Sequence, residues 1–215
     1  MVLGLSAGLL LGLVGFDLLP EIFEMNSQDL IGVKAVSVAL IAGFLSLHFI
    51  EQFAGSHEPA ESDYGHEHTH TFEIAGTVGA IAMAGHIFLD GVALALAFKV
   101  SNELGFAVFI AMLVHAFSDG LNTVALLIKT GSWKKRGKFL LAVDAVARIG
   151  GAAVGSSLTI SDSNLAIYLA LFSGIVIYLA TAHILPEAHS RHPSKITMIS
   201  TLSGVAIMWV VIANL

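Results

Sequence analysis

The chain contains no cysteine among its 215 residues, so it has no disulfide, no thiolate metal ligand and no cysteine nucleophile. Charge is also scarce, because Asp, Glu, Lys and Arg make up only 12% of the residues, against about 25% in soluble domains. So few charged side chains cannot cover a globule of this size, which excludes an ordinary soluble enzyme. With 10 Lys and Arg residues and a net charge of −6, nucleic acid is excluded as a partner.

Apolar residues, in contrast, are abundant. They make up 56% of the chain, and the mean hydropathy is +0.84. A membrane-spanning helix needs about 20 mostly apolar residues to cross a hydrocarbon core of about 30 Å. Seven runs meet this description, near 1–20, 31–51, 74–98, 105–128, 139–160, 165–187 and 196–214. We therefore predict an all-α polytopic membrane helix bundle, a single transmembrane domain over 1–215 that has the lipid bilayer as its surroundings.

The first apolar run carries a stripe of small residues. Gly4, Gly8 and Gly12 share one helix face, and such spacing lets a neighbouring helix approach closely. No Lys or Arg precedes the run, so it lacks the basic start of a signal peptide. We interpret the stripe as a packing surface without a chemical role.

The basic residues predict the orientation of the chain, because cytoplasmic loops of membrane proteins are enriched in Lys and Arg. Loops on one side hold most of them, namely Lys129, Lys134, Lys135, Arg136, Lys138, Arg191 and Lys195. The other side holds Lys34 and Lys99. We therefore expect a cytoplasmic N-terminus and an external C-terminus.

The longest connection, 53–72, is rich in histidine and has neither Lys nor Arg. It contains His57, His66, His68 and His70 among several carboxylates. Its polarity predicts a flexible cytoplasmic loop, and clustered imidazoles and carboxylates bind divalent cations loosely. The alternative is a solvated loop in which the histidines have no function.

Two short patterns each occur twice. His86-Ile-Phe-Leu-Asp90-Gly is repeated as His115-Ala-Phe-Ser-Asp119-Gly, and Asp17-Leu-Leu-Pro-Glu21 is similar to His183-Ile-Leu-Pro-Glu187. In both pairs the two members lie on spans that run in opposite directions. Inverted repeats with a site at the membrane midplane are typical of secondary transporters.

The first pair of patterns predicts a metal site. His86 with Asp90, and His115 with Asp119, are four residues apart and so share one helix face. Two nitrogens and two or more oxygens would converge, a set that suits zinc, iron(II), manganese or cobalt as substrate. An Asp near a helix centre costs about 2.5–3.5 kcal/mol to insert, which a bound dication would offset. The alternative is that each His–Asp pair only joins helices.

Further polar residues within or beside the spans complete a candidate pathway. Asn122 lies two turns beyond His115 on the same face, and Asp144 with Arg148 are four apart on the fifth span. Asp144 could bind metal or be neutralised by Arg148. The remaining candidates lie near span ends. The intermediate binding sites on one side would be His48, Glu51, His183 and Glu187, and an outer entrance would be formed by Asp17 and Glu21.

These patterns resemble the Zrt/Irt-like (ZIP) family of metal transporters. His86, Asp90 and Gly91 match its fourth helix, His115 and Asp119 its fifth, and His183-Ile-Leu-Pro-Glu-Ala a later one. Asp17-Leu-Leu-Pro-Glu resembles the end of the family's second helix, and a His-rich cytoplasmic loop is typical. The resemblance implies uptake of a divalent metal, zinc first, across the plasma membrane into the cytoplasm. It also implies eight helices, of which this chain would begin at the second.

The chain departs from the family pattern at Ile87, Ala116 and Ser118. A single site built from His86, Asp90, His115 and Asp119 is therefore expected rather than two, and the Arg148 cation would repel a second ion. Two other functions stay open, a membrane metal sensor or buffer that does not transport, and an intramembrane zinc-dependent hydrolase, although the sequence has no HExxH motif. A homodimer is an option for the assembly.

Overall fold

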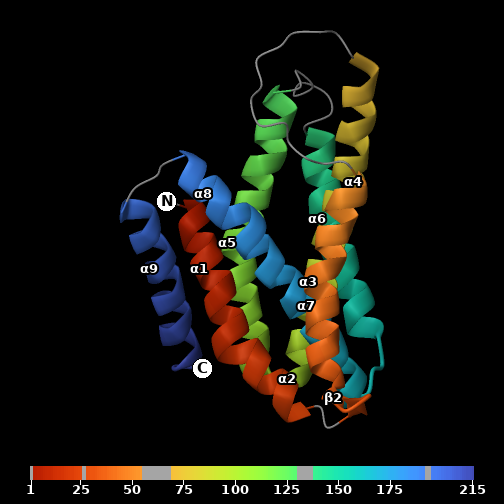
Figure 1. The fold of residues 1–215 in the computed structure, drawn as a ribbon, viewed down its shortest axis with the longest axis vertical. Coiled ribbons are helices and arrows are strands. Elements are labelled where there is room, and N and C mark those ends of the chain that lie inside the picture. The colour runs from red at the N-terminus through yellow and green to blue at the C-terminus, as the bar shows by residue number, and fades with distance from the viewer. Residues whose placement is uncertain (1, 26–27, 55–68, 130–137, 192–194) are drawn as a thin grey trace.

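The computed structural model describes residues 2–25, 28–54, 69–129, 138–191 and 195–215. Almost all of them are helical, and the helices stand together as a bundle of long rods (Figure 1). The predicted all-α architecture is therefore confirmed.

The described helices form seven rods, and each of the seven predicted apolar runs falls on one of them. The first is composite and joins α1 (Val2–Leu13), the π-helical turn η1 (Val14–Leu18) and α2 (Leu19–Met25). Another composite rod joins α7 (Asp162–Tyr178), the π-helical turn η3 (Leu179–Ile184) and α8 (Leu185–Arg191). The other rods are single α-helices, α3 (Ala35–Ala54), α4 (Thr69–Val100), α5 (Asn102–Lys129), α6 (Lys138–Ser157) and α9 (Lys195–Ile212).

The predicted loop 53–72 is shorter in the structure. Helix α3 continues to Ala54 and α4 already begins at Thr69, and residues 55–68, with His57, His66 and His68, lie outside the described residues. His70 belongs to the first turn of α4, and its side chain also lies outside them.

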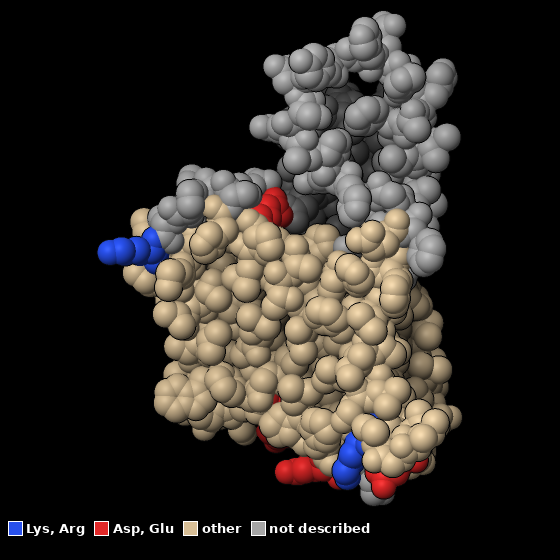
Figure 2. All heavy atoms as spheres, viewed as in Figure 1, with Lys and Arg blue, Asp and Glu red and all other residues tan. Residues whose placement is uncertain are grey.

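The surface of the bundle agrees with a position in a membrane. Three described rods are long and apolar enough to cross one, Val2–Met25, Asp162–His189 and Lys195–Ile212, and shorter apolar stretches occupy Ala35–Phe49 and Asn102–Phe117. On the face shown in Figure 2, the described charged residues gather toward the two ends and the wall between them is uncharged. This distribution is expected where the wall contacts lipid.

Two prolines account for the π-helical turns. Proline lacks an N–H, and its ring collides with the carbonyl four residues earlier in a regular α-helix. Ahead of Pro20 the Leu19 N–H bonds to the Val14 carbonyl, and ahead of Pro186 the Leu185 N–H bonds to the Ala180 carbonyl. Each bond spans five residues and widens the helix before the proline. The repeated Pro-Glu motif thus has the same local structure in two rods that run in opposite directions (Figure 1).

Reciprocal glycines bring the rods together in pairs. A Cβ atom built on Gly43 of α3 would overlap the Leu171 carbonyl of α7, and one on Gly174 of α7 would overlap the Leu40 carbonyl of α3. The predicted glycine stripe of α1 packs in the same way against α9, where Gly8 meets the Thr201 carbonyl. Such backbone contact maximises packing and needs no hydrophobic driving force, which is weak within lipid.

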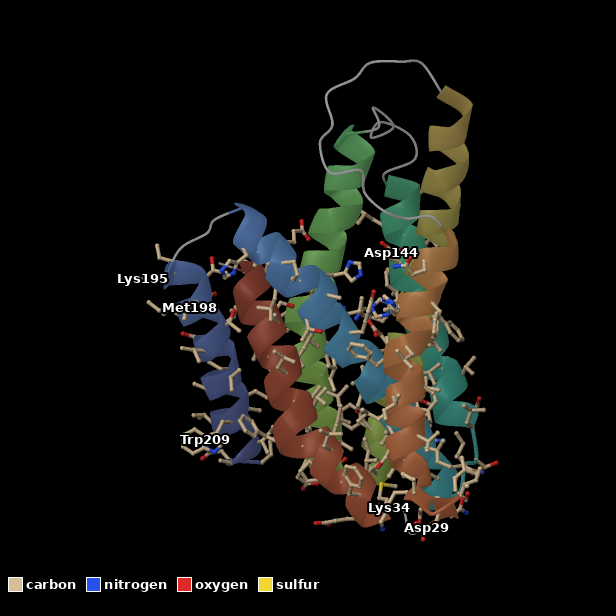
Figure 3. All side chains as sticks on the ribbon, in the orientation of Figure 1. Asp29, Lys34, Asp144, Lys195, Met198 and Trp209 are labelled. Carbon is tan, nitrogen blue, oxygen red and sulfur yellow. The ribbon has the colours of Figure 1, made fainter. Side chains whose placement is uncertain are left out.

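A short hairpin was not anticipated from the sequence. Strands β1 (Asp29–Leu30) and β2 (Val33–Lys34) pair antiparallel before α3 begins, so the second rod starts later than the apolar run 31–51 suggested. Ile31 and Gly32 both have positive φ, at 52° and 79°, as a two-residue type I′ turn requires. Asp29 and Lys34 lie at the end of the bundle where α2 ends (Figure 3).

The glycine contacts predict a stability effect. Replacing Gly43 by alanine should force α3 away from α7 and destabilise the bundle by about 2 kcal/mol, within the range for overpacking. Thermal unfolding of purified protein in detergent checks this, with Gly85→Ala as the control because nothing lies within 4 Å of a Cβ at that position. Equal melting temperatures for the two variants would contradict the packing described.

Candidate metal centre

The corner between α4 and α5 sets the depth of the predicted ligands. Only Ser101 separates the two helices, and its Oγ accepts a 3.0 Å hydrogen bond from the Leu104 N–H, so it caps the start of α5. From this corner His86 lies about four turns back along α4 and His115 about four turns forward along α5. The tight antiparallel corner therefore places the two histidines at the same depth in the bundle.

Three predicted ligands converge in the structure. His86 Nε2 lies 3.4 Å from His115 Nε2 and 3.7 Å from Asp90 Oδ2, and one ligand atom from each of the three residues lies within 4.8 Å of the others. Asp90 and His115 are only 2% and 6% exposed. The predicted convergence of side chains from two antiparallel helices is therefore seen for these three residues, with His86 and Asp90 from α4 and His115 from α5.

The spacing of these atoms suits a transition-metal ion. Two donors bound tetrahedrally to zinc, each about 2.1 Å from it, lie about 3.4 Å apart. The two separations from His86 Nε2 are close to this value. Neutral imidazole and carboxylate are also the donors that zinc, iron(II), manganese and cobalt accept. Little movement is needed for these three residues to bind one ion together.

The ligands face a small cavity with a volume of about 20 Å³, enough for one water-sized particle. Its other walls are apolar and come from α1, α5, α7 and the start of η3, with Leu13, Met112, Phe172 and Leu179 among them. Such walls keep the local dielectric constant low, so each charge in the cavity interacts strongly with its neighbours.

Arg148 adds a cation to this site. Its Nη2 lies 3.8 Å from Asp90 Oδ2, so this ion pair crosses from α6 to α4. The four-residue spacing had suggested a pair with Asp144 within α6, and the contact with Asp90 was not anticipated. Asp144 is half-buried one turn earlier in α6, toward the end where that helix begins (Figure 3).

Two predicted ligands on α5 fall outside the part of the structure that is described in atomic detail. The side chains of Asp119 and Asn122 are in this group. Both residues belong to α5, and their places one and two turns after His115 keep them on its face of the helix. Their part in the site stays a prediction.

Two of the predicted pathway residues, His48 and His183, both lie beside Tyr178, a contact that was not expected. His48 Nδ1 lies 3.3 Å from the Tyr178 hydroxyl, and the Tyr178 ring centroid is 5.7 Å from that of His183. Tyr178 was missed because its hydrophobic surroundings predict a core residue, and it is 7% exposed. Glu187 is half-buried one turn after His183, while the side chain of Glu51 lies outside the described residues.

The outer candidates Asp17 and Glu21 are both half-buried. Asp17 lies on η1, four residues after Leu13 of the cavity wall, and His183 lies on η3, four residues after Leu179 of the same wall. The inverted repeat therefore places Asp17 and His183 at corresponding positions on opposite sides of the cavity.

Fold and site together define a class of protein, a polytopic α-helical membrane protein with a buried His/Asp cluster whose donor atoms could hold a metal ion. The chain matches the family model described as ZIP Zinc transporter over residues 54–212. It belongs to this family.

Individual relatives agree with this assignment. The zinc transporter YKE4 of Saccharomyces cerevisiae is 25% identical over 221 residues, which cover 91% of this chain and 63% of the relative. The zinc transporter ZIP9 of Micropogonias undulatus is 29% identical over 161 residues, which cover 71% of this chain and 51% of the relative. The zinc transporter ZIP9 of Xenopus tropicalis is 28% identical over 187 residues, which cover 80% of this chain and 61% of the relative. The chain thus spans about half to two thirds of the length of these relatives.

The geometry predicts the effect of removing one ligand. His115→Ala should weaken zinc binding by about 100-fold, since the loss even of outer-shell partners costs 10–100-fold. Isothermal titration calorimetry on the purified protein measures this. His189→Ala is the control, because His189 is an exposed histidine on α8. Equal affinities for the two variants would exclude His115 as a ligand.

Proposed function

We propose that this protein carries a divalent cation across the membrane through the site formed by His86, Asp90 and His115, and that zinc is its preferred cation. The observation that supports this most strongly is the convergence of their three ligand atoms within 4.8 Å of one another. Asp119 is the proposed fourth ligand. Iron(II), manganese and cobalt would use the same nitrogen and oxygen donors.

Burial makes a bound cation energetically useful. Asp90 is 2% exposed, and a carboxylate deep within a membrane costs about 2.5–3.5 kcal/mol on insertion scales. A dication at Asp90 offsets this cost, and the two imidazoles replace part of its hydration shell. Because an imidazole binds metal only when it is neutral, binding should weaken as pH falls through the range in which histidine gains a proton.

We propose alternating access as the mechanism of transport. The two composite rods are inverted copies of each other, and both contribute to the cavity wall, with Leu13 from one and Leu179 from the other. Repeats that exchange conformations around a fixed midplane site would open it to each side in turn. Asp17 and Glu21 would attract the ion outside, and His183 and Glu187 would receive it on the cytoplasmic side, next to the His-rich loop.

The direction of transport is proposed as inward. The charge distribution of the loops predicts a cytoplasmic N-terminus, and uptake is what the family resemblance implies. A plasma-membrane location and a homodimer stay predictions. The names of the family and of the relatives cited above describe transporters and no hydrolase.

Uptake by reconstituted protein tests the proposal. Proteoliposomes that contain a zinc-sensitive dye should fill faster than protein-free vesicles, and His115→Ala and Asp119→Ala should each lower the rate about 100-fold. His189→Ala should retain the rate of the unmodified protein. Unchanged uptake in both site variants would refute this site. Zinc binding without uptake in the unmodified protein would instead identify a sensor or buffer.

A further inference from the structure

Arg148 lies beside the proposed transport site. An arginine within a membrane-spanning helix is costly unless it is paired or reaches water, and the side chain of Arg148 is only 22% exposed. Arg148 forms an ion pair with Asp90, whose side chain is 3% exposed. A buried carboxylate that is expected to bind metal therefore already faces a permanent positive charge.

Close packing fixes the base of this arginine. A Cβ built on Gly91 of α4 would overlap the Arg148 carbonyl of α6, and a Cβ on Gly151 of α6 would overlap the Phe88 carbonyl of α4. The backbones of α4 and α6 thus touch directly at this crossing. Arg148 cannot move away as a whole, but its long side chain can change rotamer and carry the guanidinium to another position.

The oxygen that faces Arg148 is also the one that faces the imidazole. Asp90 Oδ2 lies 3.8 Å from Arg148 Nη2 and 3.7 Å from His86 Nε2, and it has no hydrogen-bond partner among the described residues. Both distances exceed those of a hydrogen bond, so neither group is hydrogen-bonded to this oxygen. The same atom can therefore balance Arg148 or bind a metal.

We propose that Arg148 is an intrinsic counter-cation of the transport site, an inference that rests on the proposed function. When no metal is bound, the guanidinium balances Asp90, so the site can return across the membrane without a second ion or a proton. When a dication binds Oδ2, like-charge repulsion drives the guanidinium away from this oxygen, while the packed backbone keeps Arg148 beside the site. Arg148 thereby limits the site to one ion and keeps its affinity low enough for release.

Removing the charge should tighten metal binding. We expect Arg148→Gln to raise the zinc affinity, measured by isothermal titration calorimetry, by about tenfold or more, because repulsion of the bound dication is lost. Arg148→Lys retains the charge and should stay within about threefold of the unmodified protein. Lys99→Gln is the matched control, since Lys99 is also a cation on α4 that contacts the α6 side of the bundle, through the carbonyl of Leu158 directly after α6, but lies away from the site.

In proteoliposomes the Gln variant should show a lower KM together with a lower maximal rate, since release becomes slow. An unchanged or weaker zinc affinity in folded Arg148→Gln would overturn the proposal, and so would equal tightening in Arg148→Lys.

A second variant tests the proposal without altering Arg148. Asp144→Asn removes a carboxylate that lies one turn from Arg148 on the same face of α6, so the guanidinium is drawn more strongly to Asp90 and zinc binding should weaken by about tenfold. In the Arg148→Gln background the same change should have no effect, whereas a direct metal ligand would keep its effect there. An effect of equal size in both backgrounds would contradict the proposal. Failure of the unmodified protein to bind zinc at all would refute the proposed function itself.

Discussion

One buried carboxylate constrains the whole arrangement. Asp90 is 2% exposed in a bundle whose walls are apolar, and an isolated charge in such surroundings is strongly unfavourable. Only partners at short range can compensate it. The chain supplies two imidazoles, from α4 and α5, that line the same small cavity as Asp90, and a guanidinium from α6 that forms an ion pair with Asp90. The fold keeps these groups within a few ångströms of one another.

Glycine contacts and proline-induced turns hold the helices around this site in place. Because hydrophobic burial drives helix association only weakly within lipid, direct backbone contact at Gly43, Gly174, Gly91 and Gly151 replaces it. The two π-helical turns lie on opposite sides of the cavity, in rods of opposite direction. The same local motif therefore lies on both sides of the cavity, as the proposed alternating access would require.

Much of this site was predictable from the sequence. The four-residue spacing of His86 and Asp90, together with an antiparallel partner helix carrying His115, was enough to predict convergence, since both features depend on helical periodicity and on a short connection. The pairing of Arg148 with Asp90 was not predictable, because it depends on where α4 and α6 cross. Tyr178 escaped notice for a related reason, as its contact with His48 joins helices far apart in sequence.

In the proposed site, one metal ion is held by nitrogen and oxygen atoms from neighbouring helices. X-ray absorption spectroscopy at the zinc edge, on protein loaded with one equivalent of zinc, tests this most directly. We expect nitrogen and oxygen neighbours at about 2.0–2.1 Å with the outer-shell scattering of two imidazoles. A spectrum with oxygen neighbours alone and no imidazole signal would contradict it.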